Sequence, residues 1–318
     1  METRAAAPCS AERHQLDLFL DGRDAFLVHD VTTALVARDR RRAETGLGRL
    51  RHEHPRHPDL PALALLVAAL GSPPPSPATH ATITAGIEEL QERLAPAARH
   101  LVGEDAAAFL QPAWQALAAT AASLSFAPAH PLAHRSWLCQ QYGDWAAVRA
   151  AVEAEPDWPA RPCLRYRLGL ARSHLGEAEA AIRLWLPLCW TDPAFFARRA
   201  PTLPSATLRE DWEAFERAAP YEEPLAETND ATGWFPAWLL LRHPGLAHLF
   251  QADEIPDSGT PCRVFHHLLG LLPLESGGLS DAQIDGRRAL RHLSPGFFGS
   301  YMNVVARRGV RPPRPLPS

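Results

Sequence analysis

Apolar residues recur with the period of an α-helix in the stretch 162–193. Leu164, Leu168 and Ala171 lie on one face of a first helix, because they are separated by four and three residues. Gly176 follows this helix, at a point where a glycine can end it in a left-handed conformation at little steric cost. The pattern therefore predicts an amphipathic helix that stops at a tight turn.

A second apolar stripe follows the turn and includes Ala181 and Trp185. Pro187 lies inside this second helix and is expected to kink it or end it early, and Pro193 stops it. Gly169, on the first helix, is small enough for a neighbouring helix to approach closely. Two short helices joined by a tight turn pack antiparallel, and neither can bury its apolar face alone. We therefore expect further hairpins to stack on this one.

This hairpin resembles a tetratricopeptide repeat. Counted from Pro162, the family's small or apolar positions hold Leu168, Gly169, Ala181, Trp185 and Pro193. The chain departs from the family at Arg165 and Arg172, where large apolar residues are expected. Residues 24–55 resemble a second unit, and a third has its turn at Gly143, one repeat period before Gly176. The resemblance implies a short α-solenoid of antiparallel hairpins, and the alternative is a set of helical hairpins of no particular family.

The resemblance also implies a concave groove lined by the first helix of each hairpin. By that resemblance the groove-facing residues of the two central units are Trp137, Gln140, Gln141, Tyr166, Leu170, Ser173 and His174. Tyr and Trp dominate interface hot spots, so a protein or peptide partner is expected there. The alternative is that Trp137 and Tyr166 only pack hairpin against hairpin. The family's clamp for a terminal carboxylate uses Lys and Asn, and this chain has no Lys, so an apolar helix or an extended segment is the better expectation.

The rest of the sequence also favours helices, and we expect an all-α fold. Hydrophobic residues make up 46% of the 318 residues, and β-branched runs are few. Many of the 31 prolines separate apolar segments, which is typical of many short helices. The expected parts are a leader at 1–20, N-terminal helical hairpins at 21–125, central repeats at 126–200, an aromatic-rich C-terminal helical region at 201–309 and a Pro-rich tail at 310–318.

Several residues outside the central hairpin have the pattern of a helix start. Thr79 and Asp105 are predicted N-caps of two longer helices that extend to about residues 94 and 125. Thr207 and Glu210 have the spacing of a capping box, and Ser280 is a further predicted N-cap. Two non-helical segments are expected, the Pro-rich linker 71–77 and the acidic loop 221–232.

The charge pattern narrows the classes of partner. A net charge of −4 gives no broad positive field, so neither nucleic acid nor an anionic membrane is expected as a partner. The basic run 38–42 is expected to be the solvated face of a helix. No stretch approaches the roughly 18 apolar residues of a membrane-spanning helix, and the first residues lack the apolar core of a signal peptide. The five cysteines occur singly, which favours free thiols in the cytoplasm.

The chain contains no lysine, and its 32 basic residues other than histidine are all arginine. Two explanations remain open. One is a GC-rich bacterial coding sequence, and the other is avoidance of lysine-directed modification by a neighbouring enzyme. The sequence does not separate them.

No residue pattern indicates a metal, a cofactor or a catalytic centre. His52, His54 and His57 are the best metal candidates, but they lie at a helix end without a fourth ligand at standard spacing. We therefore expect neither a metal nor a cofactor, and no enzymatic activity. The alternative is an enzyme, or an enzyme's regulatory subunit, with its site in the C-terminal region around His266, His267 and His292.

The sequence thus favours a non-catalytic protein that binds another protein. It would serve as an adaptor, chaperone or scaffold subunit of a bacterial multiprotein system, such as a secretion or defence system. Homo- or hetero-oligomers through the aromatic C-terminal region are also expected, because the region carries more aromatic residues than the cap of a solenoid needs.

Overall fold

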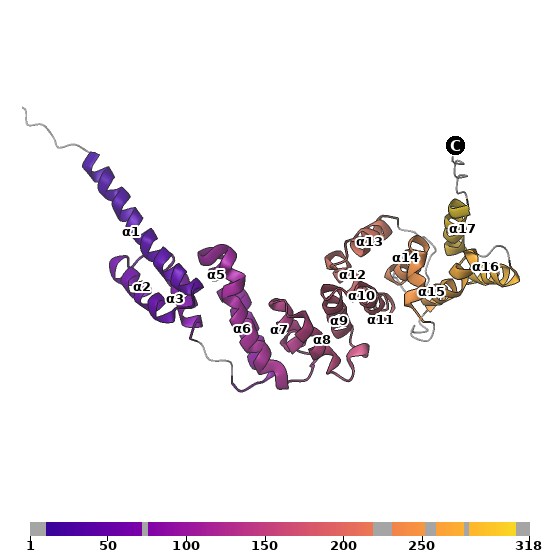
Figure 1. The fold of residues 1–318 in the computed structure, drawn as a ribbon, viewed down its shortest axis with the longest axis horizontal. Helices are drawn as coiled ribbons and strands as arrows, with labels where there is room; N and C mark the ends of the chain where they lie inside the picture. Colours follow the sequence, from indigo (N-terminus) through magenta and orange to yellow (C-terminus); the bar gives the residue numbers. More distant parts are fainter. Residues whose placement is uncertain (1–10, 72–75, 219–230, 252–258, 277–279, 310–318) are drawn as a thin grey trace, which may run out of the picture. The chain divides into compact units, whose positions relative to one another are not determined.

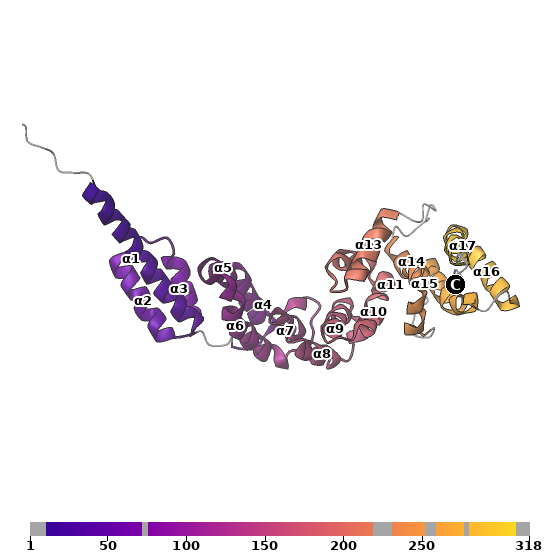
Figure 2. The same cartoon turned by 45° about the horizontal axis from the view of Figure 1, so that its top comes forward.

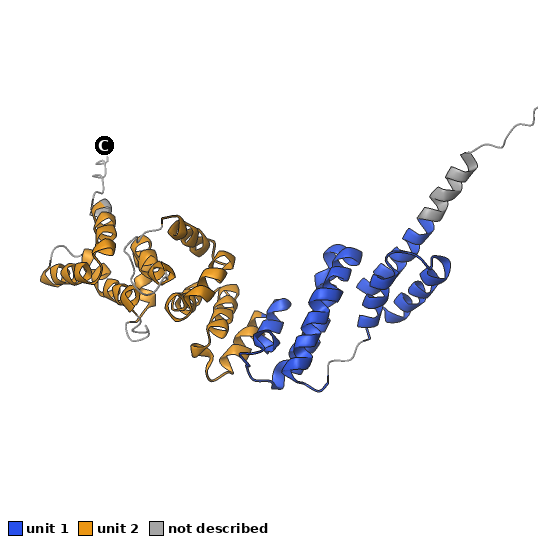
Figure 3. Ribbon diagram, turned by 180° about the vertical axis from the view of Figure 1, so that it is seen from behind, with its two compact units in different colours: residues 1–144 blue, residues 145–318 orange. Residues whose placement is uncertain are grey.

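The structure is a computed structural model that describes residues 11–71, 76–218, 231–251, 259–276 and 280–309. The regular secondary structure of these residues is helical, and they contain no strand. The chain forms two compact units, Met1–Asp144 and Trp145–Ser318 (Figure 3). Each unit is built from helices that pack on their neighbours, so the predicted all-α fold is confirmed for the described residues.

The described residues of unit 1 form helices and short 3-10 turns (Figures 1 and 2). Neighbours along the chain pack together, with α1 on α2, α2 on α3, α5 on α6 and α6 on α7. The elements are α1 (Ala11–Val36), α2 (Arg40–Glu53), α3 (Leu60–Ala69), α4 (His80–Glu88), the π-helical η1 (Glu89–Leu94), α5 (Ala95–Val102), α6 (Ala106–Thr120) and α7 (Arg135–Gln141). Short 3-10 turns are η2 (Gly103–Asp105), η3 (Ala121–Ser123) and η4 (Pro131–Ala133).

The first hairpin of unit 1 is formed by α1 and α2. Arg38 has a φ of 55° at the turn, and the Asp39 carboxylate accepts a hydrogen bond from the Arg42 backbone N–H at 3.0 Å, which caps α2. Gly46 lets the two helices approach, because a Cβ at this position would lie 2.9 Å from a methyl group of Val31. The arginines at the start of α2 are exposed, as expected for a solvated face. Helix α1 begins at Ala11, well before the predicted end of the leader at residue 20.

The helix predicted from Thr79 to about residue 94 continues in the structure to Val102 as α4, η1 and α5. Thr79 caps it as expected, because its side chain accepts from the Thr82 backbone N–H at 3.2 Å. Proline has no backbone N–H and interrupts the hydrogen bonding of an α-helix. The π-helical turn lies just before Pro96, and its wider geometry allows the helix to continue beyond this residue. Asp105 takes the predicted N-cap position of α6, but its side chain makes no capping hydrogen bond.

Unit 2 begins just after the predicted turn at Gly143 and contains the aromatic-rich region. Its helices are α8 (Trp145–Glu153), α9 (Pro162–His174), α10 (Ala178–Trp185), α11 (Leu188–Thr191), α12 (Pro193–Arg199), α13 (Ala206–Ala218), α14 (Phe235–Arg242), α15 (Gly259–Leu271), α16 (Asp281–Leu293) and α17 (Pro295–Gly309). Its 3-10 turns are η5 (Trp158–Ala160), η6 (Ala200–Thr202), η7 (Ala231–Trp234), η8 (Pro244–Leu249) and η10 (Leu272–Ser276).

The α9–α10 hairpin has the features that its sequence predicts. Gly176 has a φ of 85° in the turn. The two helices touch at Gly169, where a Cβ would lie 2.2 Å from Nε1 of Trp185. That indole N–H donates a hydrogen bond to the Tyr166 carbonyl oxygen at 3.2 Å, and the ring is 1% exposed. Helix α10 ends at Trp185, just before Pro187, as the proline predicts.

The remaining caps of unit 2 explain where its later helices begin. The Ser205 side chain accepts from the Leu208 backbone N–H at 3.3 Å, so α13 begins one residue before Thr207 and the predicted capping box at Thr207 is wrong. Ser280 caps α16 as predicted, and Ser294 caps α17, each through its side-chain oxygen at 3.3 Å. The predicted linker falls largely, and the predicted acidic loop and Pro-rich tail almost entirely, outside the described residues.

The aromatic residues of the C-terminal region form the core of unit 2. Trp212 meets the edge of Phe235 at a centroid distance of 5.1 Å, and Trp234 stacks on Phe297 at 5.8 Å. Phe297 and Tyr301 are fully buried, so α17 closes on the earlier helices of the unit. The high aromatic content of this region therefore fills an internal core, whereas its role in forming oligomers stays a prediction.

Candidate functional site

Three of the seven predicted groove residues belong to α7 in unit 1. Trp137 is half-buried, and its ring meets the edge of Trp114 at a centroid distance of 5.8 Å. Gln141 Nε2 donates a hydrogen bond to the Trp137 carbonyl oxygen at 3.1 Å, and Gln140 is half-buried. Trp137 thus packs against α6 while part of its surface stays open. The role of these residues in binding a partner stays a prediction.

Two more predicted groove residues, Tyr166 and Leu170, lie in the core of unit 2. They are 8% and 6% exposed. The Tyr166 ring meets the edge of Phe195 on α12 at 5.6 Å, and the Arg199 guanidinium lies 5.7 Å from its centroid. Packing between α9 and α12 therefore uses the surface that the resemblance assigned to a partner. Neither side chain offers a partner more than a small area.

The last two predicted groove residues lie at the C-terminal end of α9. Ser173 is half-buried and His174 is exposed. The His174 ring stacks on Trp145 of α8 at a centroid distance of 3.8 Å and an angle of 4°. One face of the imidazole is covered by this stack. The seven predicted residues thus form two groups. Three lie on α7 in unit 1, and four lie on α9 in unit 2, where two of the four are part of the core.

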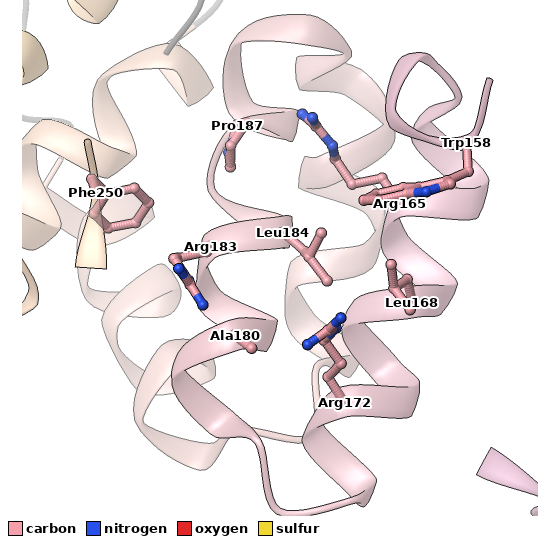
Figure 4. Close-up of a pocket in the computed structure, with 9 residues that line it drawn as sticks. All are labelled: Trp158, Arg165, Leu168, Arg172, Ala180, Arg183, Leu184, Pro187 and Phe250. Atoms are coloured by element: carbon pink, nitrogen blue, oxygen red, sulfur yellow. The ribbon is translucent and has the colours of Figure 1, made fainter. Parts of the chain in front are cut away.

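A pocket with several arginines lies on the α9–α10 hairpin (Figure 4). Its volume is about 430 Å³, which lies within the range of pockets that bind small ligands or side chains. We call it the arginine pocket, and it is lined by Trp158, Arg165, Leu168, Arg172, Ala180, Arg183, Leu184, Pro187 and Phe250. Leu168 and Leu184 face each other across the hairpin, with arginines around them (Figure 4).

Helical spacing accounts for most of this lining. Arg165, Leu168 and Arg172 follow one another by three and four residues along α9, so they share one face of the helix. Ala180 and Leu184 share a face of α10 in the same way. Two of the three arginines of α9, Arg165 and Arg172, lie on this face, and the helix carries no acidic residue.

Arg172 is the one arginine of the arginine pocket with ion pairs among the described residues. Its guanidinium donates to Glu177 Oε2 at 2.9 Å and to Glu153 Oε1 at 3.1 Å. Glu177 also accepts from Arg149 at 3.0 Å, so two arginines and two glutamates form a balanced network. This network ties α8 to the α9–α10 hairpin and leaves Arg172 little charge to offer a ligand.

Arg165 and Arg183 have no ion pair among the residues that the structure describes. The Arg165 side chain is half-buried, and its Nε is buried without a hydrogen-bond partner in the described part of the chain. Burial lowers the pKa of Arg165, and no neighbouring carboxylate opposes that effect. Arg183 is exposed on α10. The arginine pocket therefore holds two guanidinium groups whose charge is not compensated within the described structure.

A buried carboxylate in unit 2 has its partners already in place. Asp211 on α13 is 3% exposed. Its Oδ1 accepts from Arg242 Nε at 2.9 Å, and its Oδ2 lies 2.7 Å from His243 Nε2. The Arg242 guanidinium also lies 4.8 Å from the centroid of Trp238. These contacts hold the C-terminal end of α14 against α13, which is a structural role.

The histidines of the alternative enzymatic hypothesis differ in burial and in their contacts. His267 Nε2 lies 2.7 Å from the Gly286 carbonyl oxygen, which joins α15 to α16, and His292 is exposed. His266 is half-buried on the same helix as His267. Between these helices lies the apolar core that includes Phe265 and Leu290. Whether this region also holds an enzymatic site stays a prediction.

Glu275 joins three elements at the C-terminal end of unit 2. Its carboxylate accepts from Arg287 Nε at 3.1 Å and from the Tyr301 hydroxyl. Burial by itself would raise the pKa of Glu275, but the hydrogen bonds from Arg287 and Tyr301 outweigh it, and the pKa lies below its ordinary value. Burial and the bond to Glu275 raise the pKa of Tyr301. This cluster braces α16 and α17.

The three histidines predicted as the best metal candidates have other surroundings. His57 Nε2 lies 3.8 Å from an oxygen of Asp24, and His57 Nδ1 accepts from the Asp59 backbone N–H at 3.2 Å. His52 is exposed and His54 is half-buried. Among the described residues, no group of three or more His, Cys, Asp or Glu side chains is placed to hold a metal ion. The described helices also include none with the length and apolar character needed to cross a membrane.

Comparison of the chain with protein families, curated proteins and solved structures gives no match. Among the sites described, the arginine pocket combines a cavity with charged groups that lack partners in the described residues. It is therefore the strongest candidate for binding.

Proposed function

We propose that this chain is a non-catalytic adaptor, chaperone or scaffold subunit that binds another protein in the cytoplasm. The arginine pocket carries the proposal, because Arg165 and Arg183 lack compensating charges in the described structure. A half-buried guanidinium without a counter-charge costs free energy in the unbound protein. That cost is recovered when a partner supplies an anionic group, which makes the pocket a suitable binding site.

The α9–α10 hairpin is well built for this role. Close packing of Trp185 against Gly169 holds the two helices together. The residues of the pocket are therefore held in fixed positions. Arg172 is fixed by Glu153 and Glu177 and shapes one end of the pocket. Rigid presentation of arginines and aromatic side chains is typical of protein interfaces, in which these residue types are enriched.

Affinity purification from the native host tests this proposal. Tagged wild type, Arg183→Glu and the matched control Arg291→Glu are expressed at equal levels, and co-purified proteins are quantified by mass spectrometry. Arg291 is an exposed arginine of unit 2 on α16, outside the pocket. We expect a partner that is retained by wild type and Arg291→Glu and lost with Arg183→Glu. Equal recovery of every partner by all three proteins would show that the arginine pocket is not the binding site.

A further inference from the structure

The arginine pocket contains two uncompensated charges at separate points. Arg165 extends from α9 toward Pro187, and Arg183 extends from α10 on the other side of Leu184 (Figure 4). Because the two guanidinium groups do not converge, a single compact anion such as one phosphate does not bridge them. The arrangement instead fits two separate monoanionic groups that belong to one ligand.

The surface between the two arginines is apolar. Leu184 lies between the two charged groups, Leu168 and Ala180 also line the pocket, and Trp158 and Phe250 line its edges (Figure 4). Trp158 and Phe250 are half-buried, so both offer contact area to a ligand. A ligand that fills the arginine pocket therefore presents an apolar group between its two anionic groups.

Arg172, in the same pocket, forms ion pairs with carboxylates. It binds Glu153 and Glu177 of its own chain at 3.1 and 2.9 Å. The Arg165 guanidinium, on the same face of α9, has its Nε buried and no such partner among the described residues. A carboxylate from outside the chain would give Arg165 the kind of contact that Arg172 already has.

We propose that the arginine pocket binds an acidic peptide segment of the partner protein, in which two Asp or Glu carboxylates flank apolar residues. This inference rests on the proposed function and adds the chemical class of the partner. One carboxylate binds Arg165 in the half-buried part of the pocket, and the other binds Arg183 at its exposed side. The apolar residues of the peptide lie on Leu184 and Phe250, which are half-buried.

The binding test uses the full chain and a fluorescein-labelled peptide with the sequence Gly-Glu-Leu-Leu-Glu-Gly, followed by fluorescence anisotropy. The control peptide has Gln in place of both Glu residues. We expect the Gln peptide to bind at least about tenfold more weakly, and Arg165→Met or Arg183→Met to weaken binding of the Glu peptide by about tenfold or more. Arg291→Met, outside the pocket, is expected to leave the affinity unchanged.

Thermal unfolding of the same variants shows whether a loss of binding reflects misfolding. Arg165→Met removes a half-buried charge without a described partner and keeps the apolar part of the side chain, so we expect its Tm to equal or exceed that of wild type. A lower Tm together with lost binding would mean that Arg165 has a structural role, which would overturn its assignment to the ligand. Affinity that does not fall when salt is raised from about 50 to 300 mM would likewise contradict charge recognition.

The outcomes separate this inference from the proposed function. If the host partner is lost with Arg183→Glu but the Glu and Gln peptides bind equally or not at all, the pocket is a protein-binding site and the acidic class is wrong. If inorganic phosphate at millimolar concentration displaces the Glu peptide completely, a phosphoryl group is the ligand and the two-carboxylate assignment is overturned. If a single-stranded oligonucleotide binds more tightly than the Glu peptide, both proposals are wrong.

Discussion

The contact between Gly169 and Trp185 gives the most quantitative prediction for this fold. In Gly169→Ala the new Cβ would lie 2.2 Å from Nε1 and 2.7 Å from Cδ1 of the Trp185 ring. Atoms that are not bonded do not approach so closely, so either the ring or the helix has to move. The Trp185 ring is 1% exposed and is enclosed by the core of unit 2, so it cannot swing into solvent.

The size of the effect follows from three contributions. Overpacking of a filled core costs about 1–3 kcal/mol. Displacement of the indole breaks its hydrogen bond to the Tyr166 carbonyl oxygen inside the core, which costs about 1–2 kcal/mol more. Alanine in a helix interior gains about 1 kcal/mol over glycine, which opposes the other two. We therefore expect Gly169→Ala to lower the free energy of unfolding of unit 2 by about 1–4 kcal/mol.

Hydrogen exchange followed by mass spectrometry measures this change where it occurs. The chain has two compact units, so one denaturation curve does not report unit 2 alone, whereas exchange in peptides from α9 and α10 gives the local free energy of opening. Gly299→Ala is the matched control. Gly299 is a helical glycine of unit 2, and a Cβ at this position would meet nothing within 4 Å, so alanine there should stabilise by about 0.5–1 kcal/mol.

A second variant tests the same contact from the other helix. Trp185→Phe makes room for the methyl group of Gly169→Ala, so the double variant should lose less stability than the sum of the two single variants. The reasoning is refuted if Gly169→Ala slows hydrogen exchange in α9 and α10 to the same degree that Gly299→Ala slows it in α17. It is also refuted if the two substitutions at the contact are simply additive.

Three further predictions concern unit 2. Asp211→Asn removes the charge that holds Arg242 and His243, and we expect it to lower the free energy of opening by about 2 kcal/mol, as measured by hydrogen exchange in peptides from α13 and α14. Because the pKa of Glu275 in the folded chain is below the ordinary 4.5, its carboxylate stabilises the fold above that pH and this contribution is lost as the pH falls. Hydrogen exchange in peptides from α16 and α17 between pH 7 and 3, corrected for intrinsic exchange rates, should therefore show a smaller loss of stability for Glu275→Gln than for wild type. Burial raises the pKa of Cys163, so iodoacetamide at pH 8 should modify it more slowly than a free thiol, as followed by peptide mass spectrometry. The buried Cys189 and Cys262 of unit 2 should react only after unfolding.

The parts of the fold that the sequence predicted correctly are set by local chemistry. Gly176 and Pro187 act on the backbone next to them, so the turn and the end of α10 follow from the residue type. Thr79 and Ser280 cap the helices that follow them for the same reason. Thr207 failed because Ser205, two residues earlier, is also a strong N-cap and makes the bond instead. Which of two neighbouring residues caps α13 depends on the tertiary packing that fixes where the helix starts, and the sequence does not show this packing.

The candidate site depends on packing between residues that are distant in the sequence. The sequence therefore predicted less of the site than of the helices. Tyr166 and Leu170 have the spacing of an open helix face, but α12 covers Tyr166 through Phe195. Helical periodicity marks which residues share a face and does not reveal which element will cover it. Arg165 and Arg172 were visible as departures from the repeat pattern. Their pocket was not, because it is completed by Phe250, which is distant in the sequence.

Site-specific photo-crosslinking in the native host tests the central claim most directly. The photoreactive residue p-benzoylphenylalanine replaces Ala180, which lines the arginine pocket, and a control protein carries it in place of the exposed Glu216 on α13. We predict a protein adduct from position 180 whose crosslinked segment contains two acidic residues that flank apolar ones, and no such adduct from position 216. The same adducts from both positions, or none from position 180, would contradict the claim that the arginine pocket binds an acidic segment of a partner.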